Sequence, residues 1–142
     1  MAMDVIRGED WTGPVPNGEA EYGAFFEAAA DGRLLIQACP NCGHRQFYPR
    51  ALCTSCAGDP QWLECSGDAT VHTFTVVRQY GGEPFAHQLP YVLAMVDLAE
   101  GVRMFGTLTD VDVESVEIGM PVTAYAREYE PGRALVYWRP AR

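Results

Sequence analysis

Lysine is absent from this chain of 142 residues, and all ten of its basic side chains are arginine. Without a lysine amine the chain cannot form a Schiff base, so lysine-dependent aldolase and pyridoxal-phosphate chemistry are excluded. The Walker A motif is excluded as well, because it requires a lysine. Carriers that attach biotin or lipoate to a lysine are excluded for the same reason.

Positive charge is scarce. Ten arginines face 19 acidic residues, which gives a formal net charge of -9 and a pI of about 4.6. A nucleic-acid duplex normally requires a basic face, and an anionic membrane attracts basic segments. The charge balance therefore disfavours both as partners.

Long hydrophobic runs are also missing. No segment approaches the 18 continuous apolar residues of a membrane span. The first residues, MAMDVIRGEDWTGPVP, lack the apolar centre of a secretory signal. We therefore expect a cytoplasmic protein whose thiols stay reduced.

Common catalytic motifs are absent too. The chain contains no G-x-S-x-G, H-E-x-x-H or G-x-G-x-x-G sequence. Its three histidines, His44, His72 and His87, have no evident carboxylate partner in the sequence. We expect no catalytic residue in this chain and no enzymatic activity of the chain on its own.

An amphipathic helix is predicted near the N-terminus. Tyr22, Phe25, Phe26 and Ala29 recur at helical spacing within residues 19–31. We expect these aromatic side chains to pack on the chain's own core, with a face for a partner or an acyl chain as the alternative. The proline- and glycine-containing residues 1–18 are predicted to form an extended or loosely ordered arm.

Two cysteine pairs predict a metal centre. Cys39 and Cys42 form one C-x2-C turn, and Cys53 and Cys56 form a second. Two such turns complete a tetrahedron of thiolates, for which zinc is the expected ion and iron the competitor. Four protein ligands leave no open position on the metal, so we expect the site to be structural. Removal of the metal by a chelator should then unfold residues 34–66. Cys65 is expected to be a buried thiol rather than a nucleophile.

The second half of the chain is predicted to consist of β-strands. Five strand-like segments rich in β-branched and aromatic residues are separated by glycine-containing turns. Five short strands in so few residues suit a small closed barrel of the OB type. The predicted strands are 69–80, 91–98, 102–109, 121–129 and 133–139, and we expect only a turn or two of helix in 110–118.

The order of these motifs resembles a family called domain of unknown function 35, in which a rubredoxin-like zinc ribbon precedes an OB fold. The likeness covers about residues 20–140. The segments that carry it are G-R-L-L-I-Q-A-C-P-N-C-G, Y-P-R, C-T-S-C, H-T-F-T-V-V, P-Y-V-L-A-M-V-D-L-A-E-G-V-R and I-G-M-P-V. By position, Cys39, Cys42, Cys53 and Cys56 match the family's zinc ligands.

The resemblance implies a mainly β fold with an N-terminal helix, and three parts. These are an arm and amphipathic helix over 1–33, a zinc ribbon over 34–66 and a five-stranded OB-fold barrel over 67–142.

The resemblance also implies a function in acyl-CoA metabolism. Family members are often small subunits of thiolase-superfamily enzymes, in which the thiolase-like or lipid-transfer-protein-like partner supplies the catalytic residues. The chain would then be a non-catalytic subunit of a hetero-oligomer. The partner would cleave a steroid-type side-chain CoA thioester by a retro-aldol reaction, or would carry out thiolase or acyltransferase chemistry.

If the chain itself contacts acyl-CoA, its arginines must bind the phosphates of CoA, because the chain has no lysine. The candidate ligand-binding residues are Arg45, Arg50, Phe74, Phe85, Tyr91 and Phe105, and the candidate partner-interface residues are Tyr22, Phe25 and Phe26.

Two other functions stay open at this point. A stand-alone acyl-CoA-binding protein would hold the acyl chain in the barrel. A module for single-stranded nucleic acid would need aromatic platforms on a basic groove. The aromatic residues are present, but the barrel half of the chain is acidic, which disfavours the second function.

Overall fold

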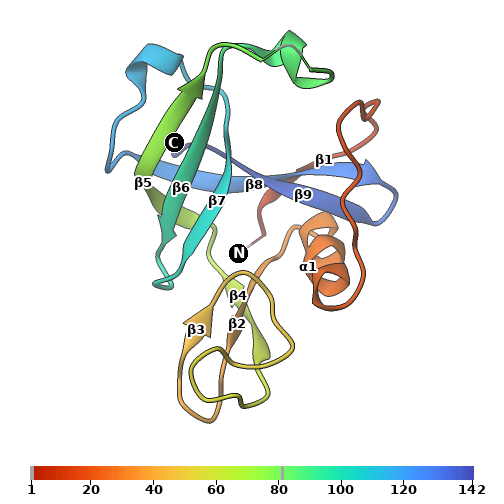
Figure 1. Cartoon of the computed structure of the whole chain (residues 1–142), viewed down its shortest axis with the longest axis vertical. Helices are drawn as coiled ribbons and strands as arrows, with labels where there is room; N and C mark the ends of the chain where they lie inside the picture. The colour runs from red at the N-terminus through yellow and green to blue at the C-terminus, as the bar shows by residue number, and fades with distance from the viewer. Residues whose placement is uncertain (1, 81) are drawn as a thin grey trace.

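The computed structural model describes residues 2–80 and 82–142, which form a mostly β protein with one α-helix (Figure 1). A three-stranded sheet lies at one end and contains β2 (Leu34–Ala38), β3 (Arg45–Gln46) and β4 (Gln61–Cys65) in the order β3-β2-β4. A six-stranded sheet has the order β1-β8-β5-β6-β7-β9. Its strands are β1 (Asp4–Ile6), β5 (Asp68–Val77), β6 (Tyr91–Leu98), β7 (Arg103–Leu108), β8 (Pro121–Glu130) and β9 (Arg133–Pro140).

The larger sheet closes on itself as the predicted OB-fold barrel. β8 pairs with both β5 and β9, and β7 reaches β9 where Leu108 lies beside Trp138. Alternation along the strands fixes which face is inside. On β6, Val92, Ala94 and Val96 are buried, while Met95 points outward. All five predicted barrel strands are confirmed.

The predicted helical turn between the third and fourth barrel strands is present in its shortest form. It is the 3₁₀ turn η2 (Val113–Ser115), and the Asp112 carboxylate accepts a hydrogen bond from the Glu114 N–H at its start. A second 3₁₀ turn, η1 (Phe85–Gln88), lies between β5 and β6.

The helix α1 (Glu21–Ala30) packs its aromatic face into the chain's own core. Phe25 and Phe26 are 6% and 7% exposed, and their rings meet those of Phe47 and Tyr129. The alternative of a partner-binding face is therefore wrong for these two residues, because their surfaces are already covered. Tyr22 is half-buried and stacks on Phe26.

The ribbon, the helix and the barrel share one hydrophobic core. Leu34, Leu35 and Ile36 of β2 belong to the same buried cluster as Phe25 of α1 and Trp138 of β9. Trp138 and Ile36 are completely buried. The chain passes from β4 to β5 through Ser66 and Gly67, and Cys65 and Ala69 on either side of this junction belong to the same buried cluster.

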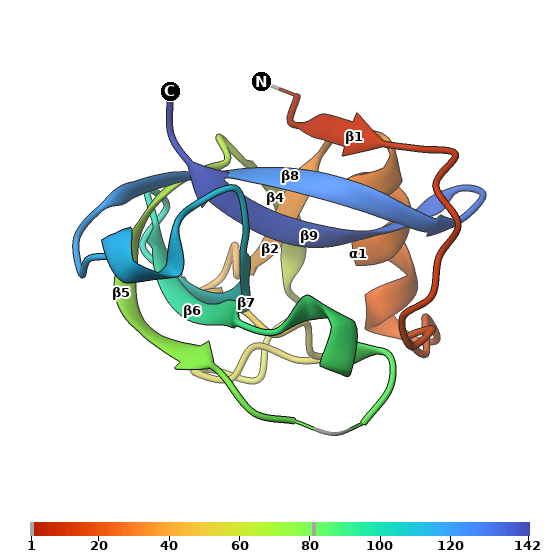
Figure 2. The same cartoon turned by 90° about the horizontal axis from the view of Figure 1, so that it is seen from above.

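The N-terminal arm is more ordered than the sequence predicts. β1 runs parallel to β8, with Val5 opposite Ala126 (Figure 2). Ion pairs tie the arm to the barrel: Asp4 bonds Arg139, and Glu9 lies 3.1 Å from the Arg127 guanidinium. Three residues are too short a strand to produce a recognisable pattern. None of the helices in the described part of the chain has the length and apolar character needed to cross a membrane.

Candidate functional site

Four cysteine side chains converge at the outer end of the ribbon. The Sγ atoms of Cys39, Cys42, Cys53 and Cys56 all lie within 4.8 Å of one another. The Cys39–Cys56 and Cys42–Cys53 separations are 3.5 and 3.7 Å. A tetrahedron with metal–sulfur bonds of about 2.3 Å has edges of about 3.8 Å, so the four thiols fit one ion.

The two knuckles repeat the same backbone turn. The N–H of Gly43 donates to the Cys39 carbonyl over 2.8 Å, and the N–H of Ala57 donates to the Cys53 carbonyl over 2.9 Å. Gly43 and Ala57 both have positive φ angles, of 78° and 62°. Ala57 therefore adopts a conformation that glycine reaches more easily.

Gly58 is needed for space rather than for its backbone angles. A Cβ atom there would lie 3.1 Å from the Cys56 Sγ and 3.3 Å from the Cys39 Sγ. The Gly58 N–H also donates to the Cys56 Sγ over 3.4 Å. The side-chain amide of Asn41 donates to the same sulfur, and together these two donors lower the pKa of Cys56 to about 6.

Two buried glutamines hold the loop between the knuckles. The Gln37 side chain donates to the Arg50 carbonyl over 2.9 Å and accepts from the Arg50 N–H over 2.8 Å. Gln46 donates to Gln37 Oε1 over 2.8 Å and accepts from the Thr54 N–H over 2.9 Å. This glutamine clamp, Gln37 with Gln46, fixes the segment that carries Cys53. Sequence reasoning missed it, because glutamine is usually exposed.

Cys65 lies apart from the metal centre. It is 2% exposed at the end of β4, and burial together with the charge of Glu100 raises the pKa of its thiol to about 12. The expectation of an inert buried thiol is consistent with these surroundings.

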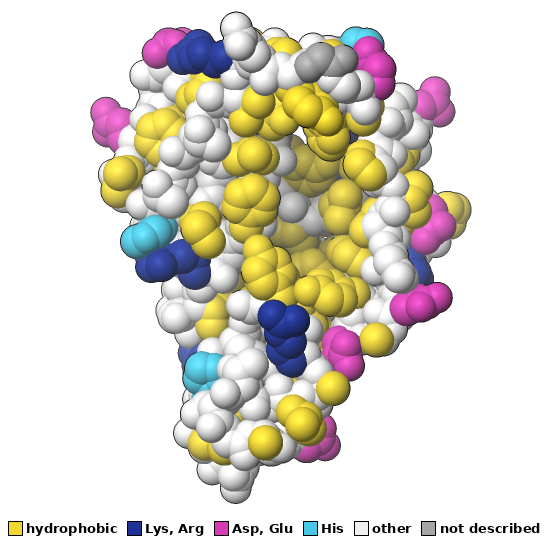
Figure 3. All heavy atoms as spheres, viewed as in Figure 1, with side chains coloured by type: hydrophobic (Ala, Val, Ile, Leu, Met, Phe, Trp, Pro, Cys, Tyr) yellow, Lys and Arg dark blue, Asp and Glu magenta, His cyan; other side chains and the backbone are white. Residues whose placement is uncertain are grey.

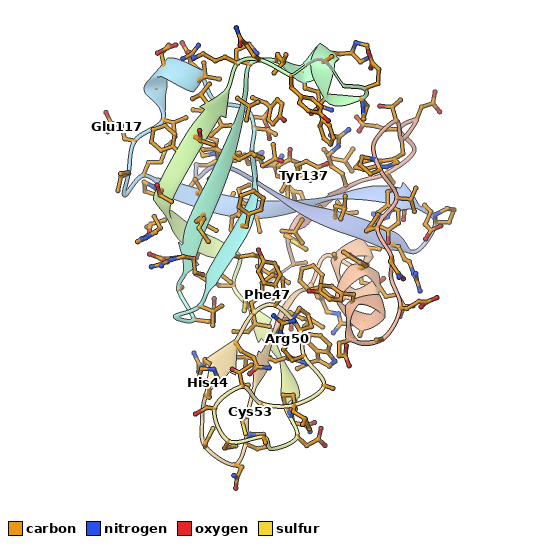
Figure 4. The ribbon with its side chains drawn as sticks, viewed as in Figure 1. His44, Phe47, Arg50, Cys53, Glu117 and Tyr137 are labelled. Atoms are coloured by element: carbon orange, nitrogen blue, oxygen red, sulfur yellow. The ribbon has the colours of Figure 1, made fainter. Side chains whose placement is uncertain are left out.

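A basic cleft lies beside the ribbon. It has a volume of about 340 Å³, and Arg45, Arg50 and Arg103 contribute to its walls together with His44. Arg103 is paired with Asp97 over 2.7 Å, and Arg45 donates to the Glu100 carbonyl. Among the described residues, no carboxylate lies within ion-pair distance of Arg45 or Arg50. Figure 4 shows Arg50 on the ribbon, below Phe47.

The structure does not gather the four predicted aromatic residues around one cavity. Phe74 faces inward and packs against the barrel core, whereas Phe105 is 49% exposed on the outer face. Phe85 and Tyr91 do meet, with ring centroids 6.2 Å apart. Phe85 also lines a hollow on the outer face of the barrel, beside Tyr137 and Trp11. Sequence reasoning assigned no role to Trp11 or Tyr137, because their meeting depends on the fold.

Comparisons with known proteins agree with this architecture. A family model described as "ChsH2, rubredoxin-like zinc ribbon domain" matches residues 26–62, and one described as "ChsH2, C-terminal OB-fold domain" matches residues 62–127. A DUF35 domain-containing scaffold protein of Methanocaldococcus jannaschii is 37% identical over 96 residues, which are 66% of this chain and 67% of that protein.

Two further relatives carry names that refer to reactions. The 3-oxo-4,17-pregnadiene-20-carboxyl-CoA hydratase alpha subunit of Mycobacterium tuberculosis is 40% identical over 125 residues, which are 88% of this chain. This chain spans 39% of that subunit's length. A solved structure titled "Ltp2-ChsH2(DUF35) aldolase" contains a chain that is 33% identical, with a TM-score of 0.78 over 91% of this chain and 99% of that one.

Proposed function

Because the chain belongs to the DUF35 family, whose members join a rubredoxin-like zinc ribbon to an OB-fold domain, we propose that it is a non-catalytic, zinc-binding accessory subunit. The enzyme that it serves is a member of the thiolase superfamily that acts on acyl-CoA thioesters. The observation that carries the proposal is the similarity, over 91% of the chain, to a chain of a structure titled as an aldolase with Ltp2. The partner's reaction is retro-aldol cleavage of a steroid-type side-chain thioester, or thiolase or acyltransferase chemistry.

Zinc is the proposed ion at the four cysteines. A tetrathiolate set suits zinc, and it leaves no position for a substrate, so the ion's contribution is to fold stability. In the chain itself, the N–H groups of Ser55 and Gly58 donate to the Cys53 and Cys56 sulfurs, each over 3.4 Å. These donors stabilise the thiolate forms that hold a metal.

The basic cleft is the proposed place where this chain meets the phosphates of CoA. Arg45 and Arg50 are exposed there, and each presents a charge with no described carboxylate beside it. In a chain of net charge -9, two such arginines on one cleft favour an anion as the ligand.

The subunit role is tested by affinity purification of the tagged chain from its native host. We expect a thiolase-like protein to co-purify in a fixed ratio that survives gel filtration, and the preparation to contain one zinc per chain. A zinc-loaded chain that elutes alone at every concentration would overturn the proposed role.

The CoA contact is tested separately in the assembled complex. The double variant Arg45→Ala/Arg50→Ala should raise the KM for the thioester at least fivefold while kcat changes little, since it removes ground-state binding. Arg33→Ala is the matched control, because Arg33 is exposed but lines a different hollow. Equal KM values for the double variant and the control would contradict the binding of CoA phosphates in the basic cleft.

A further inference from the structure

A hollow on the outer face of the barrel is enclosed by the N-terminal arm. It measures about 350 Å³ and is walled by Trp11, Pro14 and Pro16 of the arm, Phe85 of η1, and Leu135 and Tyr137 of β9. Figure 3 shows this hollow among hydrophobic side chains, on the face where Figure 4 labels Tyr137. We call it the arm pocket. Its volume lies within the roughly 300–1,000 Å³ of typical small-molecule sites.

The positive charge that Arg127 brings to the arm pocket is already paired with a carboxylate. Among the described residues that line it, Arg127 alone is charged, and Glu9 pairs with it over 3.1 Å. The guanidinium carbon lies 5.6 Å from the ring centroid of Trp11 and 5.2 Å from that of Tyr137. A ligand phosphate or carboxylate would have to compete with Glu9, so the pocket favours an uncharged group.

The walls are held in place without a ligand. β1 pairs with β8, and the Trp11 indole N–H donates to the Pro14 carbonyl over 3.2 Å. The Trp11 ring also packs against the buried ring of Tyr129, with centroids 6.1 Å apart. Rigid aromatic and proline walls reduce the entropy lost on binding, which favours a small molecule entering a preformed site.

We propose that the arm pocket binds the uncharged hydrocarbon part of a small-molecule ligand. The identification of that part as the acyl group of a CoA thioester rests on the proposed function, whereas the pocket's preference for an uncharged apolar group does not. Thr107 and Gln88 line the same pocket, and their uncharged polar side chains are of a kind that can hydrogen-bond to a polar oxygen on the ligand.

The test is a fluorescence titration of the zinc-loaded full chain with N-phenyl-1-naphthylamine, a neutral apolar probe. We expect saturable binding by the wild-type chain. Trp11→Ala removes one wall and Thr107→Trp fills the pocket, so each should weaken binding at least tenfold. Trp62→Ala is the matched control, since Trp62 is a partly exposed tryptophan on β4 of the ribbon, and it should change binding less than twofold. Circular dichroism verifies that each variant folds.

Competition identifies the part of the ligand that enters. Octanoyl-CoA should displace the probe, and free CoA at the same concentration should not. Absence of saturable binding, equal loss in the Trp62→Ala control, or displacement by free CoA would each overturn the proposal. Exclusion of the probe from the assembled complex would also overturn it, because the pocket would then be a socket for the partner.

The two proposals fail in different experiments. A complex that forms around a chain with no probe binding retains the subunit role and loses the arm pocket. Probe binding by a chain for which no partner is found retains the arm pocket and loses the subunit role.

Discussion

At the scale of single residues, the two metal-binding knuckles reach the same turn with different amino acids. Gly43 occupies the left-handed position of the first knuckle, whereas Ala57 occupies it in the second. In the second knuckle a glycine stands one position later, at Gly58, where a Cβ atom would lie only 3.1 and 3.3 Å from two of the ligand sulfurs. The spacing of the cysteines predicts both turns, but the reason for Gly58 is visible only once the sulfurs are placed.

Gly58→Ala should weaken metal binding at least tenfold, because its Cβ atom would press on the Cys56 and Cys39 sulfurs. Ala57→Gly is the matched control, and it should leave affinity equal to or slightly tighter than wild type, since it removes backbone strain. Competition with a chromophoric chelator measures both. Wild-type affinity in Gly58→Ala would show that the knuckle relaxes around the methyl group.

The glutamine clamp should contribute several hydrogen bonds to the stability of the folded chain. Gln37→Leu leaves the Arg50 backbone groups and the Gln46 amide without their partner. Each unsatisfied buried group costs about 1–3 kcal/mol. The Gln46 amide keeps its hydrogen bond to the Leu52 carbonyl over 3.3 Å, and Arg50 is exposed to water, so we expect a total loss of about 2–4 kcal/mol in the free energy of unfolding. Urea denaturation measures it. The control Gln61→Leu, at an exposed position of β4, should change stability by less than about 0.5 kcal/mol.

Thiol titration should separate Cys65 from the other four cysteines. Burial and the charge of Glu100 raise the pKa of the Cys65 thiol to about 12, so its reactive thiolate form is scarce at pH 8. After chelation we expect four thiols to react quickly with a disulfide reagent, and the fifth to react only in denaturant. A fifth thiol that reacts as fast as the rest in native buffer would contradict the burial of Cys65.

At the scale of elements, the local patterns predict the barrel strands and the helix well. β-branched and aromatic residues between glycine-containing turns mark the barrel strands, and the spacing of Phe25 and Phe26 marks α1. Strand β1 and the walls of the arm pocket could not be predicted in the same way. β1 has three residues, and its partner β8 lies about 120 positions later, so no local period records the pairing.

Metal removal should affect the ribbon unevenly. Leu34, Leu35 and Ile36 of β2 are packed in the main core, whereas the knuckles beyond Ala38 carry the four cysteines of the metal centre. After chelation we therefore expect amide hydrogen exchange to rise first in residues 39–58, with β2 protected longer. Mass-spectrometric hydrogen exchange measures this. Equal loss of protection in the knuckles and in β2 would show that the whole 34–66 segment unfolds as one unit.

At the scale of the whole molecule, the shared core makes the ribbon and the barrel energetically dependent on each other. Ile36, from the ribbon, is as fully buried as Trp138, from the barrel. Residues of α1 lie in the same cluster. The sequence motifs predict a ribbon and a barrel, but not which residues of each enter this common cluster.

Ile36→Ala should therefore destabilise the entire protein rather than the ribbon alone. We expect a loss of about 2–5 kcal/mol in the free energy of unfolding and a single shifted thermal transition. Leu52→Ala, at a side chain 56% exposed on the knuckle loop, is the control and should have little effect. Two separate transitions in the calorimetry of Ile36→Ala would contradict a common core.

The parallel pairing of β1 with β8 also sets an order of events during synthesis on the ribosome. Asp4–Ile6 leaves the exit tunnel about 120 residues before its partners Tyr125–Arg127. The ribbon, whose strands lie within 34–65, can pair long before that. The arm therefore has no strand partner while the intervening residues are synthesised, and the nascent chain acquires the arm-enclosed hollow only when the hairpin of β8 and β9 emerges.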